Sequence, residues 1–284
     1  MTHAAYDLLL PAVRSTCVVF ASPHSGSEYS AAFLAQSRLD AQTIRSSEDA
    51  HVGALFDAAP RHGAPLLLAR VPRAFVDFNR AAEDLDPAVI DGVRRLSQNP
   101  RVASGLGVIP RVVAGGRAIY DGKISLAQAH GRITTFWRPW HDRLQALLDE
   151  SGQMFGRGIL IDCHSMPHEA LDTIGSARPD VVIGDRFGAS ASADIVAEVE
   201  AALTDAGLRV VRNMPFAGAY VTQTYGKPAR RRHAIQIEVD RALYMNEVTL
   251  ERRADFEDLR ALLGDVVARV AAYGASDDRA MAAE

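Results

Sequence analysis

The stretch GILIDCHSMP at residues 158–167 decides the fold of this chain, together with CVVFASPHSG at residues 17–26. Each contains a continuous apolar run bounded by turn-forming residues, which is typical of a strand buried on both faces in a parallel sheet. Each run ends on a histidine that we expect in a turn, His164 in the first stretch and His24 in the second. Because open α/β sheets bind ligands outside the carboxyl ends of such strands, the two imidazoles could share one metal ion there.

The composition is that of an ordinary globular protein and excludes several classes of partner. Of the 284 residues, 48% are apolar and 23% are charged, and the formal net charge of −4 gives no field that attracts nucleic acid or an anionic membrane. Cys17 and Cys163 fall in apolar runs, which favours packing in a reducing compartment over a disulfide framework. No apolar run approaches the length of a membrane span and no signal-peptide pattern is present, so we expect a soluble cytoplasmic protein.

Strand and helix patterns alternate along the chain. Apolar runs predict further strands at 65–70, 180–184, 208–212 and 234–239, and residues 108–120 predict a β-hairpin. Helical periodicity predicts helices from about residue 46, over 125–150 with a kink at Pro139, over 190–206 and over 248–272. The alternation predicts one domain, a three-layer α/β/α sandwich with a mostly parallel, mixed central sheet. We place this domain at residues 1–273 and expect residues 274–284 to form a frayed tail.

A metal ion shared by the two histidines needs a third ligand, which must be acidic or another histidine. Glu48, Asp49 and His51 form the cluster nearest to His24 in sequence. Carboxylates at a helix start are also favoured by the helix dipole, so this cluster has a purely structural interpretation as well. We expect Glu48 or Asp49 to bind the ion, and the residues themselves leave the choice between them open.

Two further patterns indicate polar chemistry. The segment VDFNR at residues 76–80 places Arg80 next to apolar residues, so its guanidinium needs a substrate anion or an internal acid such as Asp77 as its partner. In the strand predicted at 234–239, Glu238 shares one face with Gln236, opposite the apolar face. A carboxylate there is suited to act as a general base, although the same pattern also fits an ordinary solvated strand face.

Eight short motifs, taken in order, are similar to those of one enzyme family. They are SPHSG (22–26), SED (47–49), VDFNR (76–80), GLGVIPR (105–111), RPWH (138–141), DCHSMP (162–167), GDRFG (184–188) and QIE (236–238) followed by Tyr244-Met245. Together they resemble the N-formylglutamate amidohydrolases, zinc-dependent hydrolases of histidine breakdown related to the carboxypeptidase and aspartoacylase fold. The resemblance covers residues 22–245 and implies a phosphorylase/hydrolase-like mixed sheet with zinc at the strand ends.

The resemblance also implies roles for individual residues. It assigns His24 and His164 to one divalent metal, most simply Zn²⁺, with the third ligand from the region of Asp49. It implies that Asn79 and Arg80 hold the substrate carboxylate and that Glu238 is the general base. We expect Arg111 to be a second cation for the substrate carboxylate.

The reaction implied is hydrolysis of the N-acyl amide of an acidic amino acid, in which N-formyl-L-glutamate and water give formate and L-glutamate. Two alternatives stay open, a zinc deacylase for a different N-acyl amino acid and a non-catalytic carboxylate-binding protein on the same fold. The sequence departs from the family pattern at Thr224, where many members have a histidine before Tyr-Gly, and at Gly53, where an aspartate is common. These departures concern the substrate more than the hydrolytic chemistry.

Overall fold

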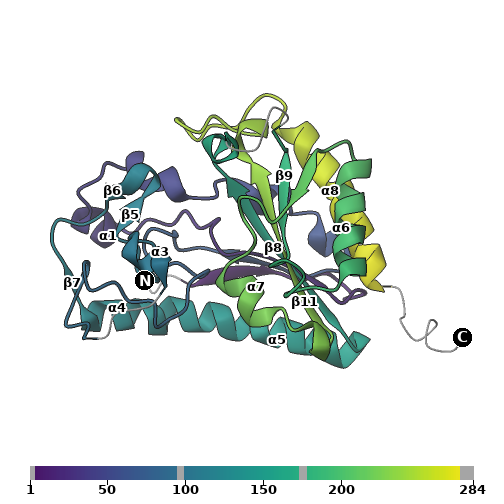
Figure 1. Ribbon diagram of the computed structural model, residues 1–284, viewed down its shortest axis with the longest axis horizontal. Helices are drawn as coiled ribbons and strands as arrows, with labels where there is room; N and C mark the ends of the chain where they lie inside the picture. The colour runs from purple at the N-terminus through teal and green to yellow at the C-terminus, as the bar shows by residue number, and fades with distance from the viewer. Residues whose placement is uncertain (1–3, 95–98, 173–177, 276–284) are drawn as a thin grey trace, which may run out of the picture.

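The computed structural model describes residues 4–94, 99–172 and 178–275, which form an α/β domain around one seven-stranded sheet (Figure 1). The strand order is β1-β3-β2-β8-β11-β9-β10. Four of the six strand pairings are parallel, while β1 is antiparallel to β3 and β9 is antiparallel to β11. The expected mostly parallel, mixed sheet is therefore confirmed. The strands are β1 Tyr6–Leu9, β2 Val18–Ser22, β3 Leu66–Ala69, β8 Gly158–Met166, β9 Val181–Gly184, β10 Val210–Arg212 and β11 Arg232–Asp240.

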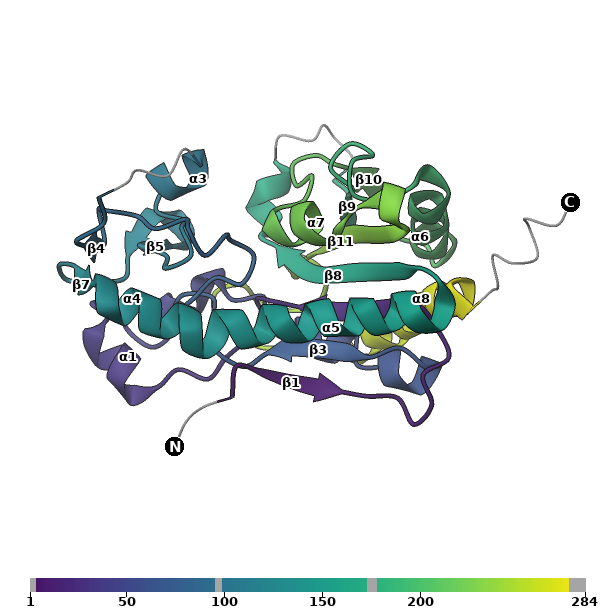
Figure 2. The same ribbon diagram turned by 90° about the horizontal axis from the view of Figure 1, so that it is seen from below.

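Helices cover both faces of the sheet, as expected for three layers (Figures 1 and 2). One apolar core joins the sheet to α2 (Val52–Leu55), α6 (Ala193–Asp205) and α8 (Phe256–Ala275). The other core joins it to α4 (Leu126–Arg132), α5 (Arg138–Phe155) and α7 (Tyr220–Tyr225). Alternate residues of one strand enter opposite cores: Phe20 contributes to the first and Val19 to the second. Burial of both strand faces explains why β2 and β8 are continuously apolar over most of their length.

Smaller elements gather at one end of the molecule, beyond the carboxyl ends of β2, β8 and β11. They are α1 Ala31–Gln36, α3 Pro100–Ala103, and the short strand pairs β4 Ile90–Asp91 with β7 Ile124–Ser125 and β5 Val112–Val113 with β6 Arg117–Ala118. The expected hairpin at 108–120 is therefore present as the β5–β6 pair, in a shorter form. Figure 2 shows α3 and β5 together at this end, away from α6.

Two helix predictions are wrong in their starting points. The helix expected from residue 46 is a 3₁₀ turn at Thr43–Ser47, followed by the four-residue α2. The helix expected over 248–272 begins only at Phe256, because the Asn246 side chain accepts the backbone N–H groups of residues 248 and 249 and folds that segment into a turn. The apolar spacing around Leu250 reflects packing of this turn, in which Leu250 is buried with a φ of 60°.

The long helix expected over 125–150 is present and continues through Pro139, the position at which we expected a kink. A π-helical turn at Ile133–Trp137 joins α4 to α5 directly before Pro139, and the helix then continues to Phe155. Such a turn accommodates the missing proline N–H.

The end of α8 also differs from the expectation, because the helix continues through Gly274 and Ala275. A Cβ on Gly274 would lie 2.3 Å from Thr16 Oγ1 and 2.4 Å from Val18 Cγ2, so glycine allows this close helix–sheet contact. The remainder of the expected tail, residues 276–284, lies outside the described residues. In the part of the chain that is described, none of the helices has the length and apolar character of a membrane span.

Candidate metal centre and substrate cavity

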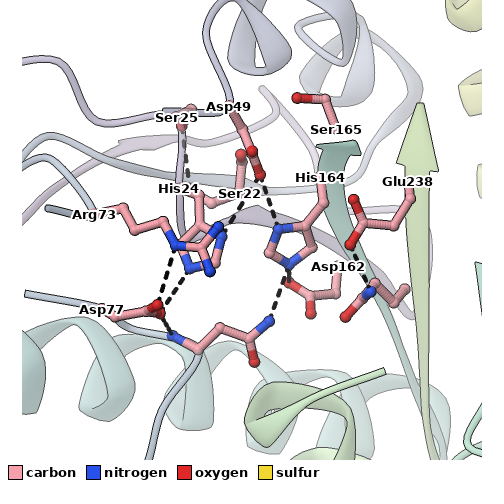
Figure 3. Close-up of polar contacts among 12 residues, drawn as sticks. Ser22, His24, Ser25, Asp49, Arg73, Asp77, Asp162, His164, Ser165 and Glu238 are labelled. Atoms are coloured by element: carbon pink, nitrogen blue, oxygen red, sulfur yellow. Dashed lines mark hydrogen bonds and ion pairs between the residues drawn. The ribbon is translucent and has the colours of Figure 1, made fainter. Parts of the chain in front are cut away.

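The two predicted histidines meet where β2 and β8 approach the same edge of the sheet. His24 lies in a turn just after β2, and the backbone of this segment approaches Val71 so closely that a Cβ on Gly26 would be 2.0 Å from the Val71 carbonyl oxygen. His164 lies inside β8, so the expectation that it occupies a turn is wrong. Both side chains are buried, and their ring centroids are 4.7 Å apart (Figure 3).

Asp49 brings a carboxylate between the two imidazoles. Its Oδ2 atom lies 3.0 Å from His164 Nδ1 and 3.6 Å from His24 Nδ1. The Asp49 backbone N–H donates to the His24 carbonyl oxygen, which fixes the loop against the turn. Glu48 points elsewhere, where it accepts hydrogen bonds from Arg45 and Tyr29. The structure thus brings Asp49, and not Glu48, to the two histidines, with the three ligand atoms within 4.8 Å of one another.

The outer ring nitrogens of both histidines face other carboxylates. His24 Nε2 donates to Asp77 Oδ1 at 2.7 Å, and His164 Nε2 lies 3.2 Å from Asp162 Oδ1 (Figure 3). With their protons on Nε2, the two histidines would present both Nδ1 lone pairs toward Asp49. Carboxylate–histidine pairs of this kind orient and strengthen the histidine ligands of metal ions.

In that protonation state three acceptor atoms converge, and a cation is the group that satisfies them. His24 Nδ1 is buried and has no hydrogen-bond partner among the described residues, while the second Asp49 oxygen accepts from Arg241 at 2.9 Å. Two imidazole nitrogens with one carboxylate oxygen form a donor set typical of catalytic zinc. These residues therefore fit a divalent metal ion.

The electrostatics of the cluster also favour positive charge. Burial works against a charged carboxylate at Asp49, but hydrogen bonds from His164 and His24 outweigh it and hold the pKa of Asp49 well below its ordinary value. Burial likewise disfavours a charged imidazole at His164, but Asp162 and Asp49 outweigh it and raise the pKa of His164 well above its ordinary value. The cluster thus retains a proton in the absence of metal, and a divalent ion would take that proton's place.

Glu238 lies beside this cluster on the neighbouring strand. In the parallel pairing of β8 with β11, Glu238 is in register with His164, and Figure 3 shows the two side chains next to each other. Gln236 Nε2 donates to Glu238 Oε1 at 2.8 Å. Burial raises the pKa of Glu238 to about 7, with Asp49 adding to the rise and His164 opposing it. A carboxyl group with this pKa can exchange a proton with substrate at neutral pH.

The metal cluster and Glu238 form the floor of a cavity of about 390 Å³, a volume within the range of small-molecule sites. Its walls include Arg101 of α3, β5 with the following residues 114–116, residues 165–167 and Ala170, and Phe216, Gly218 and Ala219. Four arginines line it, namely Arg73, Arg80, Arg101 and Arg241.

Asn79 and Arg80 lie in this wall. Asn79 Oδ1 accepts from the Val221 backbone N–H, and its amide nitrogen is 3.2 Å from His164 Nε2. The Arg80 guanidinium donates to the carbonyl oxygens of Leu106 and Asn79, at 2.8 and 2.6 Å, while its Nη2 is buried without a partner among the described residues. Its hydrogen bonds thus go to carbonyl groups rather than to an acid, and one N–H edge stays available for a ligand.

Asp77, which the sequence offered as the partner of Arg80, instead accepts from His24 and from Arg73 Nε at 3.1 Å. It affects Arg80 only through its charge: burial lowers the pKa of Arg80 to about 10, and Asp77 opposes that shift. Arg73 is therefore a site residue that sequence reasoning missed, and Asp77 is one whose partners it did not identify. The available signal was an acidic residue within the apolar run VDF, which needs a buried donor.

The structure does not bring Arg111 to the site. Arg111 Nε donates to Asp86 at 2.9 Å, its Nη2 donates to the Ala103 carbonyl oxygen, and it is absent from the lining of the cavity. The two departures from the family pattern also lie outside this lining, Thr224 in α7 and Gly53 in α2. The expectation that Thr224 and Gly53 alter the substrate therefore receives no support from a direct contact with the cavity.

Comparison with known proteins identifies the family. The model of the N-formylglutamate amidohydrolase family matches residues 16–245, which span the metal cluster and Glu238. The chain belongs to this family. An N-formylglutamate deformylase of Pseudomonas aeruginosa is 28% identical over 90% of this chain and 93% of its own length. One of Pseudomonas putida is 27% identical over 81% of this chain and 82% of its own length.

Solved structures agree with this membership of the N-formylglutamate amidohydrolase family. The crystal structure of N-formylglutamate amidohydrolase from Ralstonia eutropha JMP134 is 37% identical and covers 96% of this chain and 99% of its own, with a TM-score of 0.90. A gene product of Agrobacterium tumefaciens covers 95% of this chain and 97% of its own with a TM-score of 0.63, and at 18% identity it supports the fold alone.

Proposed function

We propose that this chain is a metal-dependent amidohydrolase that converts N-formyl-L-glutamate and water into formate and L-glutamate. One observation supports it most: two buried histidine nitrogens and the Asp49 carboxylate converge on one point at the floor of a cavity that is lined by arginines. The relatives named as N-formylglutamate deformylases suggest the substrate. We place the protein in a reducing compartment, the cytoplasm, because both cysteines are free and buried.

His24, Asp49 and His164 would hold one divalent ion, with Zn²⁺ the best match to their donor atoms. When bound, such an ion supplies Lewis acidity, which makes a water molecule more acidic and an amide carbonyl more electrophilic. Asp77 and Asp162 face the Nε2 atoms of the two imidazoles and would hold their Nδ1 atoms toward the ion.

Glu238 moves the proton. At neutral pH a group with a pKa of about 7 is partly ionised, so it can accept a proton from the attacking water. The same carboxyl group can then donate that proton to the amine that leaves when the C–N bond of the amide breaks. Gln236 orients the carboxylate by donating to one oxygen and leaves the other free for this exchange.

Arginines are placed to stabilise the negative charge on the reacting carbonyl oxygen and on the substrate carboxylate. Arg73 lines the cavity beside His24, and only its Nε is bonded to Asp77, so its other N–H groups are suited to stabilise charge that develops on the carbonyl oxygen. Arg80 offers its unpartnered Nη2 to a carboxylate of the substrate. Asn79, bonded to the Val221 backbone N–H, fixes this part of the wall against α7.

The cavity itself supports one alternative, a deacylase for a different N-acyl amino acid. Its volume of about 390 Å³ and the apolar side chains in its walls, including Val112, Val113 and Phe216, leave room for a larger acyl group. A non-catalytic carboxylate-binding protein also stays possible, but the placement of Glu238 beside the metal cluster favours turnover.

Formate release from N-formyl-L-glutamate, measured with the zinc-loaded and the chelator-treated protein, tests the proposal. We expect formate release only from the loaded protein, and slower hydrolysis of N-acetyl-L-glutamate. Faster hydrolysis of the acetyl compound would favour the alternative deacylase. Substrate binding without any hydrolysis, in a protein with full metal content, would show a binding protein instead.

A further inference from the structure

The four arginines of the cavity differ in how their charges are neutralised. Arg241 is bonded to Asp49 and Arg73 to Asp77. Arg80 bonds only to carbonyl oxygens, and the Arg101 side chain has no hydrogen bond or ion pair among the described residues. Two of the four cations therefore face the cavity without an acidic partner.

These two unpaired cations lie within electrostatic reach of each other. Arg101 acts on Arg80 as a like charge and contributes to lowering its pKa, after burial and alongside Arg73. The charge of Asp84 raises the pKa of Arg80 instead. However, Asp84 is bonded to Asn99 and does not line the cavity. The acidic side chains that do line the cavity, Asp49 and Glu238, lie at its floor with the histidines. Two neighbouring cations without acids between them are best satisfied by a ligand with two negative groups.

The two arginines differ in depth. Arg80 is 2% exposed, and its Nη1 donates to the carbonyl oxygen of Asn79, whose amide nitrogen is 3.2 Å from His164, so Arg80 lies deeper in the cavity and nearer the metal cluster. Arg101 is exposed and projects from α3 at the mouth of the cavity. In an N-acyl amino acid, the α-carboxylate is attached to the carbon that carries the reacting nitrogen, whereas the side-chain carboxylate lies further away. Arg80, the deeper cation, therefore matches the α-carboxylate. Arg101, the outer cation, matches the side-chain carboxylate.

We propose that Arg101 is the residue that selects an acidic side chain: it binds the side-chain carboxylate of a dicarboxylic N-acyl amino acid whose α-carboxylate is bound by Arg80. This inference rests on the proposed function, because it places the reacting amide at the floor of the cavity. Neither the sequence motifs nor the resemblance singled out Arg101.

The test compares N-formyl-L-glutamate with N-formyl-L-glutamine, which has the same shape but an uncharged side chain, in the zinc-loaded wild-type protein and in Arg101→Gln. A hydrogen bond between charged groups is worth at least about tenfold in affinity. We therefore expect the wild type to prefer the glutamate compound. In Arg101→Gln the KM for that compound rises about tenfold with little change in kcat, while the kinetics on the glutamine compound stay the same. Arg101→Lys, which keeps the charge, retains most of the preference.

Arg61→Gln is the matched control, because Arg61 is exposed and lies in a different surface hollow, between residues 12–15 and the end of α8. It keeps the wild-type preference. The inference is overturned if Arg101→Gln keeps that preference too, if it slows both substrates equally, or if the wild type does not distinguish the two compounds.

A second measurement separates this inference from the proposed function. If the wild type releases formate from neither compound, the proposed function fails. Calorimetric binding of L-glutamate and L-glutamine to the wild type and Arg101→Gln then still decides the role of Arg101. Weaker binding of L-glutamate alone in the variant supports the inference, and equal binding of L-glutamate to both proteins overturns it.

Discussion

The floor of the cavity and the two arginines above it, Arg80 and Arg101, are built in opposite ways. At the floor, every metal-facing side chain has a further partner: Asp77 for His24, Asp162 for His164 and Arg241 for Asp49. Above the floor, Arg80 retains a buried Nη2 without a partner, and Arg101, at the mouth, has no partner among the described residues. The metal-facing groups of the floor are thus already held in place for a cation, whereas the two arginines above the floor lack the anions that would complete their hydrogen bonds.

This difference indicates which function each part of the cavity can have. Pre-organisation of charged groups contributes to catalysis because no reorganisation is needed at the moment of reaction. Unpaired cations contribute instead to recognition, because a bound carboxylate supplies the hydrogen bonds that the free protein lacks. Changes at the floor should therefore abolish turnover or metal binding, and changes at Arg80 or Arg101 should weaken substrate binding.

The largest effect is expected from His164→Ala, which removes one of the three converging ligand atoms. We expect bound zinc to fall from one per chain to near zero and formate release to fall by at least about a thousandfold. Metal analysis of the folded protein, together with the formate assay, measures both. Cys163→Ala is the control, because Cys163 is adjacent in β8 but packs into the opposite core, and it should keep its zinc. Turnover with full metal content in His164→Ala would remove His164 from the set of ligands.

Glu238→Gln should keep its zinc and its KM but lose kcat by about a hundredfold or more, because an amide cannot accept the proton. In the wild type, kcat/KM should fall as the pH decreases below about 7, where Glu238 becomes protonated. The variant should lack this pH dependence. Glu48→Gln is a matched control, since Glu48 faces Arg45 and Tyr29, and it should stay active. An unchanged kcat in Glu238→Gln would exclude Glu238 as the base.

A more moderate effect is expected from Asp77→Asn at the floor. This change weakens the hydrogen bond that orients His24, and it removes the charge that neutralises Arg73. Zinc affinity, measured by competition with a chelator, should decrease about 10- to 100-fold. Asp86→Asn removes a buried carboxylate that pairs with Arg111 outside the cavity, and it should leave the affinity unchanged. Equal zinc affinity in Asp77→Asn and wild type would contradict the role of Asp77.

The smallest effect is expected above the floor, from Arg80→Lys. Lysine cannot bond to the Leu106 and Asn79 carbonyl groups and still present a planar N–H edge to a carboxylate. KM for N-formyl-L-glutamate should rise about tenfold, with zinc content unchanged and a smaller change in kcat. Arg111→Lys is the comparison variant and should behave like wild type. If Arg111→Lys weakened binding and Arg80→Lys did not, the assignment of the two arginines would be reversed.

The sequence predicted the floor better than the mouth, and the reason is physical. Strand ends in a parallel sheet meet at one edge, so the apolar runs before His24 and His164 were enough to place both residues at the same edge of the sheet. Arg101 belongs to a four-residue helix that no periodicity reveals, and only the folded chain places it over a cavity formed mostly by other segments.

Other details depended on tertiary contacts that a local pattern cannot supply. Glu48 and Asp49 are neighbours in a helix-start pattern, and only the packing of the loop against the His24 turn decides which one faces inward. The direction of β9, antiparallel to β11, follows from a connection whose path the sequence does not indicate. The predicted start of α8 was wrong because Leu250 is buried in a turn that the Asn246 side chain stabilises. From sequence, a buried leucine in such a turn looks the same as one on the buried face of a helix.

The most direct test of the account is anomalous diffraction at the zinc absorption edge from crystals of the zinc-loaded protein. We predict a single strong peak per chain within bonding distance of His24 Nδ1, His164 Nδ1 and an Asp49 carboxylate oxygen. An active protein without zinc at this position, or with its zinc bound by other residues, would contradict it.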